Sequence, residues 1–329
     1  MKPPSLSIII VNYNGRDFLP ELFSSLDSQQ WRDFEVLFVD NASTDGSSQW
    51  VGSNYPAARV IQNSANTGFS KANNRGARES RGEFLATLNT DMRLDPAWTM
   101  EIVAPLQQRT SVAAVSSKIF LVSHPGILNG VGGAMNFLGY TWDRGMFEPD
   151  QGQYDCSEEV LFASAGAAAF RRSTFLEAGG FDEAYFMYHE DVDLCWRLRL
   201  LGHSIVTAPR AVAYHHFAGT SQRTFGLSRR EHIGERHNIR TLIKHYEWKN
   251  LRRALWRLLL LPQSPARKWI LLKNFGWNLR HLPATLVQRR RIQKLRLHSD
   301  REISRLILAS DHVPIRLQAG LEALAAKQP

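Results

Sequence analysis

Residues 6–40 read LSIIIVNYNGRDFLPELFSSLDSQQWRDFEVLFVD, and this stretch decides the fold. The apolar run at 6–11 predicts a buried strand, and a second such run follows at 34–39. Between them, residues 18–29 carry apolar side chains at helical spacing, at Phe18, Leu19, Leu22, Phe23 and Leu26. Two strands joined by a helix make a βαβ unit, so we expect the two strands to be parallel.

The same alternation of strand and helix continues through the first 110 residues. Further strands are predicted at 59–62, 84–88 and 112–116, with a helix from about residue 71. The pattern predicts an α/β fold with a largely parallel central sheet flanked by helices.

Regular patterning is lost and then returns in the second part of the chain. Residues 123–159 are rich in glycine and aromatic side chains without periodicity, as expected of loops or irregular strands that line a site. Beyond them we expect strands at 161–170 and 204–208 and helices at 173–178 and 191–201.

The charge of the chain is concentrated near its C-terminal end. The 329 residues are 43% hydrophobic and 22% charged, a composition typical of globular proteins, and carry a net charge of +9. Residues 249–297 contain 13 Lys and Arg but no Asp or Glu, so the rest of the chain, +9 minus +13, carries −4. The basic character therefore belongs to the C-terminal part alone.

Several features favour a cytoplasmic protein. The two cysteines, Cys156 and Cys195, provide no disulfide framework and no metal-ligand spacing. Residues 1–5 lack the basic flank and cleavage site of a signal peptide, and the leucine run at 258–261 is too short to span a bilayer. A reducing compartment is expected.

Polar segments follow three of the predicted strands, where α/β sheets bind their ligands. These segments are Asn12–Gly15, Asp40–Gly46 and Asn89–Asp91. Asn, Asp, Ser and Gly also serve in turns and helix caps, so one segment alone would not indicate a site. Three segments at one sheet edge favour a binding site.

The chemistry of this edge disfavours two common classes of nucleotide-binding protein. No G-x-G-x-x-G motif follows the first strand, and no G-x-x-x-x-G-K-[ST] loop occurs. Asp40 could instead accept hydrogen bonds from a base or ribose, and Asp91 could hold Mg²⁺ or Mn²⁺ against a diphosphate.

Four segments in order resemble the motifs of the inverting glycosyltransferase family 2, and most closely its bacterial rhamnosyltransferase-like branch. They are FVDNASTDGS at 38–47, NTGFSKANNRG at 66–76, LNTDM at 88–92 and GGFDEAYFMYHEDVDLCWRLRLLGHSI at 179–205. The resemblance covers about residues 6–245. It implies a GT-A fold, a Rossmann-like sheet flanked by helices, and the transfer of a sugar from a nucleotide-sugar donor.

The resemblance also implies a set of donor-binding residues. Asp40 would contact the donor's pyrimidine, and Asp91 would be the remaining carboxylate of a D-x-D-type motif that holds Mn²⁺ or Mg²⁺. Asn89 replaces the first aspartate of that motif, which puts the strength of metal dependence in question. The residues expected to line the nucleoside are Asn12, Tyr13, Asn14, Asn66, Gly68 and Asn73, with Gly68 allowing close approach of the backbone.

A histidine motif could complete the metal site. AYHHFAGTSQR at 213–223 resembles the family's H-x-x-G-x-S motif through His216, Gly219 and Ser221. An imidazole would help a lone carboxylate to hold a Mn²⁺-like ion, and His216 is preferred to His215.

The acidic segment His189–Asp193 would supply the acceptor side of the site. Inverting transfer is a single displacement and needs a carboxylate to take the proton of the acceptor hydroxyl. The resemblance assigns this role to Asp191, with Glu190 beside it in acceptor binding. The alternative is that these acidic residues only complement a helix dipole. Arg197 would pair with an acidic neighbour or with the diphosphate, and a structural ion pair is the expected role.

The basic C-terminal part alternates cations with tryptophan and leucine over residues 249–297. This pattern suits helices that lie on the inner face of the cytoplasmic membrane and contact anionic lipid. The alternative is packing on the catalytic domain or on a second subunit. Nucleic-acid binding is disfavoured because no recognition module is present.

Together these features predict two parts. Residues 1–245 would form the catalytic domain, with a donor half at 1–115 and an acceptor half at 116–245, and residues 246–329 a basic amphipathic helical region. The predicted activity is transfer of a sugar, such as L-rhamnose from dTDP-rhamnose, to a glycan or lipid-linked acceptor in cell-surface polysaccharide synthesis. The alternative is an inactive GT-A-like binding partner of a membrane assembly.

Overall fold

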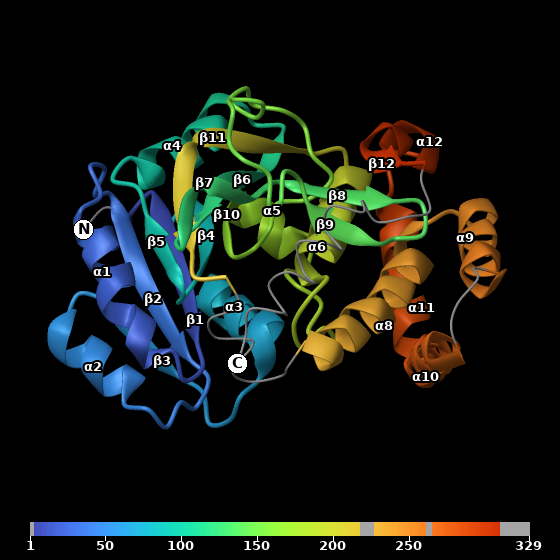
Figure 1. Ribbon diagram of the computed structural model, residues 1–329, viewed down its shortest axis with the longest axis horizontal. Helices are drawn as coiled ribbons and strands as arrows, with labels where there is room; N and C mark the ends of the chain where they lie inside the picture. Colours follow the sequence, from blue (N-terminus) through green and yellow to red (C-terminus); the bar gives the residue numbers. More distant parts are fainter. Residues whose placement is uncertain (1–2, 218–226, 261–264, 310–329) are drawn as a thin grey trace.

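A curled nine-stranded sheet forms the centre of the protein, with strand order β3-β2-β1-β4-β10-β6-β11-β5 and β7 paired with β6 (Figure 1). The computed structural model describes residues 3–217, 227–260 and 265–309. Helices cover both faces of the sheet, and the C-terminal helices gather at the end of the molecule away from β1–β3.

The first half of the sheet is parallel, as the sequence predicts. It contains β1 (Leu6–Asn12), β2 (Phe34–Asp40), β3 (Arg59–Gln62) and β4 (Phe84–Asn89). The register pairs Asn12 with Asp40 and Val11 with Asn89, so the polar segments after these strands share one edge. The helices of this half are α1 (Leu19–Asp27), α2 (Ser47–Asn54) and α3 (Gly68–Glu79).

The strand β1 shows why its sequence is apolar throughout. Leu6, Ile8 and Ile10 lie in the core on one face of the sheet, whereas Ile9 lies in the core on the other. A strand covered by helices on both faces has no solvated side, so it reads as a continuous hydrophobic run.

The second half of the sheet is mixed. The strand β10 (Ala167–Arg171) runs antiparallel to both β4 and β6 (Val112–Leu121), whereas β11 (Ser204–His215) runs parallel to β6. The edge strands are β5 (Met92–Leu94) and β7 (His124–Val131), and the helices are α4 (Trp98–Gln108), α5 (Arg172–Glu177) and α6 (Glu190–Leu200).

Two predicted segments differ from the structure. The strand expected at 161–170 is regular only in β10, because the residues before it make single backbone hydrogen bonds to separate segments, such as Phe162 O with Gly133 N and Gly166 O with Asn89 N. The aperiodic stretch at 123–159 contains β7, β8 (Gly133–Asn136) and β9 (Thr141–Asp143), and β8 and β9 belong to a second sheet of order β12-β8-β9.

The C-terminal part is helical and attached to the rest of the fold. It contains α8 (Leu227–His245), α9 (Trp248–Leu260), α10 (Pro265–Arg280), α11 (Leu282–Leu295) and α12 (Asp300–Ile303). The short strand β12 (Ile307–Leu308) returns to pair with β8. Within the described residues, no helix is long and apolar enough to cross a membrane.

The predicted boundary at 245/246 falls between α8 and α9. The helix α8 contacts α6 as well as α9, α10 and α11, so it joins the predicted catalytic domain to the C-terminal helices. The division into two parts stays a prediction.

Candidate active site

The carboxylate of Asp40 lies at the end of β2 and is fully buried. Its Oδ1 accepts a hydrogen bond from Asn12 Nδ2 at 2.9 Å, and its Oδ2 accepts from Ser43 N at 2.9 Å and Gln62 Nε2 at 2.7 Å. Burial acts to raise the pKa of Asp40, but the hydrogen bonds from Ser43, Asn12 and Gln62 hold it below its usual value. Asp40 is therefore a fixed anion that orders the loops at this edge of the sheet.

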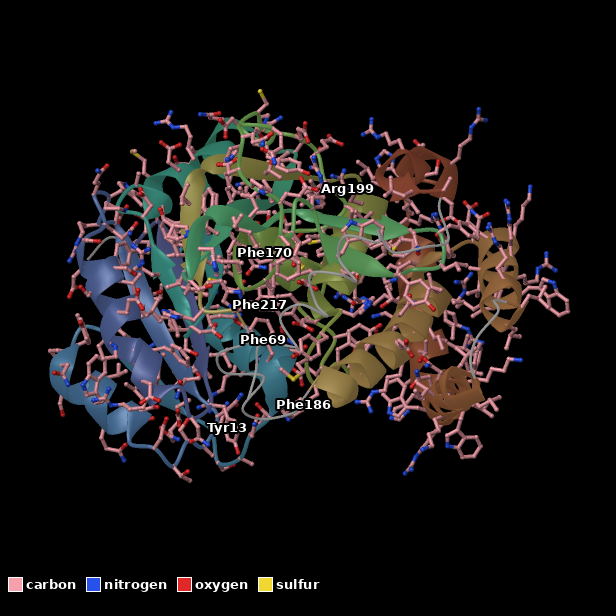
Figure 2. The ribbon with its side chains drawn as sticks, in the orientation of Figure 1. Tyr13, Phe69, Phe170, Phe186, Arg199 and Phe217 are labelled. Carbon is pink, nitrogen blue, oxygen red and sulfur yellow. The ribbon has the colours of Figure 1, made fainter. Side chains whose placement is uncertain are left out.

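The loop after β1 presents its side chains at the rim of this edge. Asn14 has a left-handed backbone, with φ of 53°, and its Oδ1 accepts a hydrogen bond from Thr44 N at 2.8 Å. Tyr13 is half-buried and Asn14 is exposed, so both are accessible to a ligand (Figure 2). The structure thus brings Asn12, Tyr13, Asn14 and Asp40 together.

Gly68 begins α3 where two distant segments meet. Asn66 Oδ1 accepts a hydrogen bond from Gly68 N at 3.0 Å, and Phe69 N donates to Phe186 O at 2.7 Å (Figure 2). Gly68 has φ of 82°, and a Cβ there would collide with the carbonyl of Phe186. The residue that lies close to the backbone of Gly68 is therefore Phe186, in the segment before α6. Asn73 is buried on the same helix, and its Nδ2 donates to Phe69 O at 3.0 Å.

Asp91 is paired with a histidine other than the expected one. His215 Nε2 lies 3.3 Å from Asp91 Oδ1, and His215 Nδ1 lies 2.6 Å from Asn129 Oδ1. His216 contacts Asp91 through its backbone, with N donating to Asp91 O at 2.9 Å, whereas its ring lies 2.6 Å from Glu21 Oε2. The structure brings Asp91 to the ring of His215 and does not bring it to the ring of His216.

Asp91 and His215 together provide two ligand types that divalent cations accept, a carboxylate and an imidazole. Within the described residues, no group of three or more His, Cys, Asp and Glu is arranged to hold a metal ion. One carboxylate and one imidazole suit a divalent cation whose remaining ligands are phosphate oxygens and water. Gly219 and Ser221 of the predicted histidine motif lie outside the described residues.

Asp191 lies in the first turn of α6, after two residues with left-handed backbone, Tyr188 and His189. Its Oδ2 accepts a hydrogen bond from Ala165 N at 3.2 Å, and its Oδ1 accepts from Val192 N at 2.8 Å. Burial raises the pKa of Asp191, although these backbone donors oppose the shift. A fixed carboxylate with a raised pKa can serve as a general base.

Glu190 differs from its neighbour in accessibility. Its side chain is 6% exposed, whereas that of Asp191 is half-buried. Burial, followed by the charge of Asp191, raises the pKa of Glu190 well above its usual value. Glu190 and Asp191 therefore lie together, with Asp191 the more accessible.

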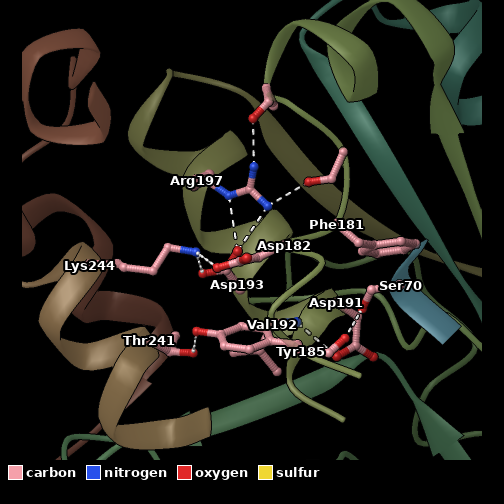
Figure 3. A network of polar contacts seen from close by, with 12 residues as sticks. Ser70, Phe181, Asp182, Tyr185, Asp191, Val192, Asp193, Arg197, Thr241 and Lys244 are labelled. Carbon is pink, nitrogen blue, oxygen red and sulfur yellow. Dashed lines mark hydrogen bonds and ion pairs between the residues drawn. The ribbon is translucent and has the colours of Figure 1, made fainter. Parts of the chain in front are cut away.

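Asp193, two residues after Asp191 on α6, belongs to a buried ion-pair network (Figure 3). Arg197 Nη2 lies 2.9 Å from its Oδ2 and also donates to Gly180 O at 2.6 Å. Lys244 Nζ lies 2.5 Å from Asp193 Oδ1 and 2.9 Å from Asp182 Oδ2. The expected structural pairing of Arg197 is confirmed.

One short segment connects Asn89, at the end of β4, to Asp191. Ala165 N donates to Asp191, and Gly166 O accepts a hydrogen bond from Asn89 N at 2.9 Å. Ser164 donates its hydroxyl to Asp143 Oδ1, a carboxylate that the sequence analysis did not identify. Its only signal was its place in the aperiodic stretch at 123–159, which predicted a site lining without naming residues.

A parallel half built from βαβ units and joined to a mixed half is the architecture of the GT-A fold. The chain belongs to Glycosyl transferase family 2, whose family model matches residues 7–177. The predicted family and fold class are confirmed.

Relatives of known name have similar sequences. The N-acetylglucosaminyl-diphospho-decaprenol L-rhamnosyltransferase of Mycobacterium tuberculosis is 30% identical over 241 residues, which cover 66% of this chain and 78% of the relative. The O-antigen biosynthesis protein RfbC of Myxococcus xanthus is 30% identical over 226 residues, or 65% of this chain. The chain spans only 24% and 17% of the length of the first two curated relatives that it matches.

The fold is similar to a solved structure with low sequence identity. GalNAc-T7, crystallised with UDP, GalNAc and Mn²⁺, superimposes with a TM-score of 0.61 at 15% identity, covering 87% of this chain and 57% of GalNAc-T7.

Proposed function

We propose that this chain is an inverting glycosyltransferase that moves a sugar from a nucleotide-sugar donor to a hydroxyl of a glycan or lipid-linked acceptor in polysaccharide synthesis. The observation that carries the proposal is the pair of contacts made by two adjacent residues, Ala165 and Gly166. Ala165 N donates a hydrogen bond to Asp191, and Gly166 O accepts one from Asn89, which lies at the edge proposed to bind the donor. A base fixed beside a donor edge is the arrangement that a single displacement needs.

The proposed reaction needs one proton acceptor from the chain. Asp191 takes the proton of the acceptor hydroxyl while the oxygen of that hydroxyl attacks the anomeric carbon. The bond from that carbon to the donor's diphosphate oxygen breaks, and the diphosphate leaves with the electron pair. The raised pKa of Asp191 makes it a stronger base than an exposed aspartate.

The donor side is assigned by its hydrogen-bonding groups. Asp40, fixed by Asn12, would accept a hydrogen bond from the base, and Tyr13 and Asn14 would line the nucleoside at the rim. Similarity to the mycobacterial L-rhamnosyltransferase supports L-rhamnose as the sugar. The carrier expected for that sugar is dTDP.

A divalent cation fits the donor chemistry at Asp91. When bound, Mn²⁺ or Mg²⁺ would neutralise charge on the departing diphosphate. Asp91 would hold it together with the imidazole of His215, and His216 could contribute only after its ring leaves Glu21. GalNAc-T7 was crystallised with Mn²⁺, which supports a divalent cation here.

The C-terminal helices provide a surface for a membrane carrying a lipid-linked acceptor. Helix α9 buries Leu251, Ala254 and Leu258 against the protein, while Trp256 on its outer side is 63% exposed. On α10, Trp269 is 61% exposed. Further exposed apolar residues of α9, α10, α11 and the segment after α11 are Leu259, Leu260, Leu272, Leu279, Val287, Leu295 and Leu297. The 13 cations and absence of acids at 249–297 complement anionic headgroups.

The test is turnover with a panel of donors. Purified protein is incubated with dTDP-L-rhamnose, UDP-sugars and GDP-sugars, Mn²⁺ and a short-chain N-acetylglucosaminyl diphospholipid, and the anomeric configuration of the product is read by NMR. We expect a product of inverted configuration from one donor class. Retained configuration would exclude the mechanism, and donor binding without any turnover would favour the inactive binding partner.

A further inference from the structure

Asp143 lies at the end of β9, and its side chain is half-buried at the site. Its Oδ1 accepts the hydroxyl hydrogen bond of Ser164. The next residue, Ala165, donates its N–H to Asp191 at 3.2 Å. Two adjacent residues of one segment therefore hold two carboxylates, one of which is the proposed base.

The other side of Asp143 faces β7. A Cβ added to Gly130 would lie 2.5 Å from Asp143 Cβ, so only glycine fits there without displacing Asp143. The residue before it, Asn129, contacts His215, which in turn contacts Asp91. The strand β7 thus places Asp143 near the contacts that link Asn129, His215 and Asp91. The Ser164–Ala165 segment places Asp143 near Asp191.

The electrostatics of Asp143 are unfavourable for stability. Burial of the Asp143 carboxylate raises its pKa to about 6. The negative charge of Asp191 adds a smaller upward shift, whereas His215 lowers the pKa. Within the described residues, no hydrogen bond to Asp143 Oδ2 occurs and no Lys or Arg pairs with its carboxylate. Strongly shifted carboxylates in such positions are typical of substrate-binding sites.

We propose that Asp143 binds the acceptor: its Oδ2 accepts a hydrogen bond from a sugar hydroxyl next to the hydroxyl that Asp191 deprotonates. This inference rests on the proposed function for the identity of the acceptor side. A carboxylate is a suitable partner for a sugar hydroxyl because it accepts strong hydrogen bonds and offers no competing donor.

The test measures acceptor binding separately from transfer. The short-chain N-acetylglucosaminyl diphospholipid is titrated by calorimetry into the wild type, Asp143→Asn and Ser164→Ala. We expect Asp143→Asn to bind it at least about tenfold more weakly, because a charge-assisted hydrogen bond is replaced by a neutral one. Ser164→Ala should weaken binding less, since the carboxylate remains.

Two controls separate binding from structure. Asp155→Asn makes the same chemical change 12 residues along the chain, at an exposed side chain that pairs with Lys118. Because Lys118 keeps its second partner, Asp150, this variant should bind the probe like the wild type. Asp143→Asn should raise Tm at pH 7.5, because it removes a disfavoured charge, whereas loss of a structural ion pair would lower Tm.

The outcomes distinguish this inference from the proposed function. Equal acceptor affinity in Asp143→Asn and the wild type would overturn the inference, as would failure of the wild type to bind the probe. Tight binding to the wild type without turnover on any donor would contradict the proposed transferase activity while leaving the role of Asp143 intact.

Discussion

Lys244 Nζ lies 2.5 Å from Asp193 Oδ1, and both side chains are completely buried (Figure 3). Lys244 belongs to α8, whereas Asp193 follows the proposed base Asp191 by two residues on α6. The ion pair therefore fastens the helix that carries the base to the helix that leads into the C-terminal part. Asp182 extends the same network to Arg240, at 2.9 Å.

We expect Lys244→Met to destabilise the protein by about 1–3 kcal/mol, because it removes the ion-pair partner of the buried Asp193 Oδ1, while Arg197 and Arg240 still pair with Asp193 and Asp182. Urea unfolding followed by circular dichroism would measure the loss. Lys249→Met, at an exposed position, is the matched control and should change stability by less than about 0.5 kcal/mol. Equal stability of the two variants would show that the buried pair contributes nothing.

The network also makes stability depend on pH. Burial acts to raise the pKa of Asp182, but Lys244 and Arg240 hold it well below its usual value. The folded-state pKa is below the unfolded value of about 4, so the stabilisation is complete above that pH and is lost as the pH falls below it. Tm should drop between about pH 4 and pH 2 in the wild type. Asp182→Asn should have a lower Tm at pH 7, and its Tm should fall less steeply between about pH 4 and pH 2. A fall in Tm as steep as that of the wild type would show that Asp182 is not the source of this pH dependence.

Metal dependence should distinguish the two adjacent histidines. His215 contacts Asp91, so His215→Ala should raise the Mn²⁺ concentration needed for half-maximal transfer by about tenfold or more. His216→Ala should have a smaller effect, because that ring contacts Glu21. Rates after EDTA treatment and Mn²⁺ titration provide the measurement. The opposite ranking would favour the role first predicted for His216.

The proposed membrane surface predicts binding to anionic vesicles. The full chain should sediment with vesicles containing phosphatidylglycerol and be released by salt, because each cation near such a surface contributes about 1 kcal/mol. The double variant Trp256→Ser and Trp269→Ser should bind more weakly. Met100→Ser, which changes a 43% exposed apolar residue on α4, is the control. Loss of a dimer in the double variant without a change in vesicle binding would instead identify a subunit interface.

The sequence predicted the features that depend on local pattern. The apolar run in β1 and the polar residues after β1, β2 and β4 follow from strand burial and parallel register, and the structure has both. The expected helix at 191–201 is α6, which begins one residue earlier. These features are encoded within a few residues of where they appear.

The remaining features depend on contacts between distant segments. His215 rather than His216 reaches Asp91 because β11 pairs with β5 in a register that the sequence does not reveal. Asp143 reaches the site through close packing against Gly130 and a hydrogen bond from Ser164, which periodicity cannot detect. Lys244 likewise lies more than 50 residues from Asp193 in sequence.

The most direct test of the account is the rate of transfer by Asp191→Asn. The substitution preserves the shape of the side chain and removes its capacity to accept the proton of the acceptor hydroxyl. We expect the rate to fall about 1,000-fold relative to the wild type, while the affinity for the donor nucleotide stays within about twofold. A rate equal to that of the wild type would contradict the assignment of Asp191 as the base.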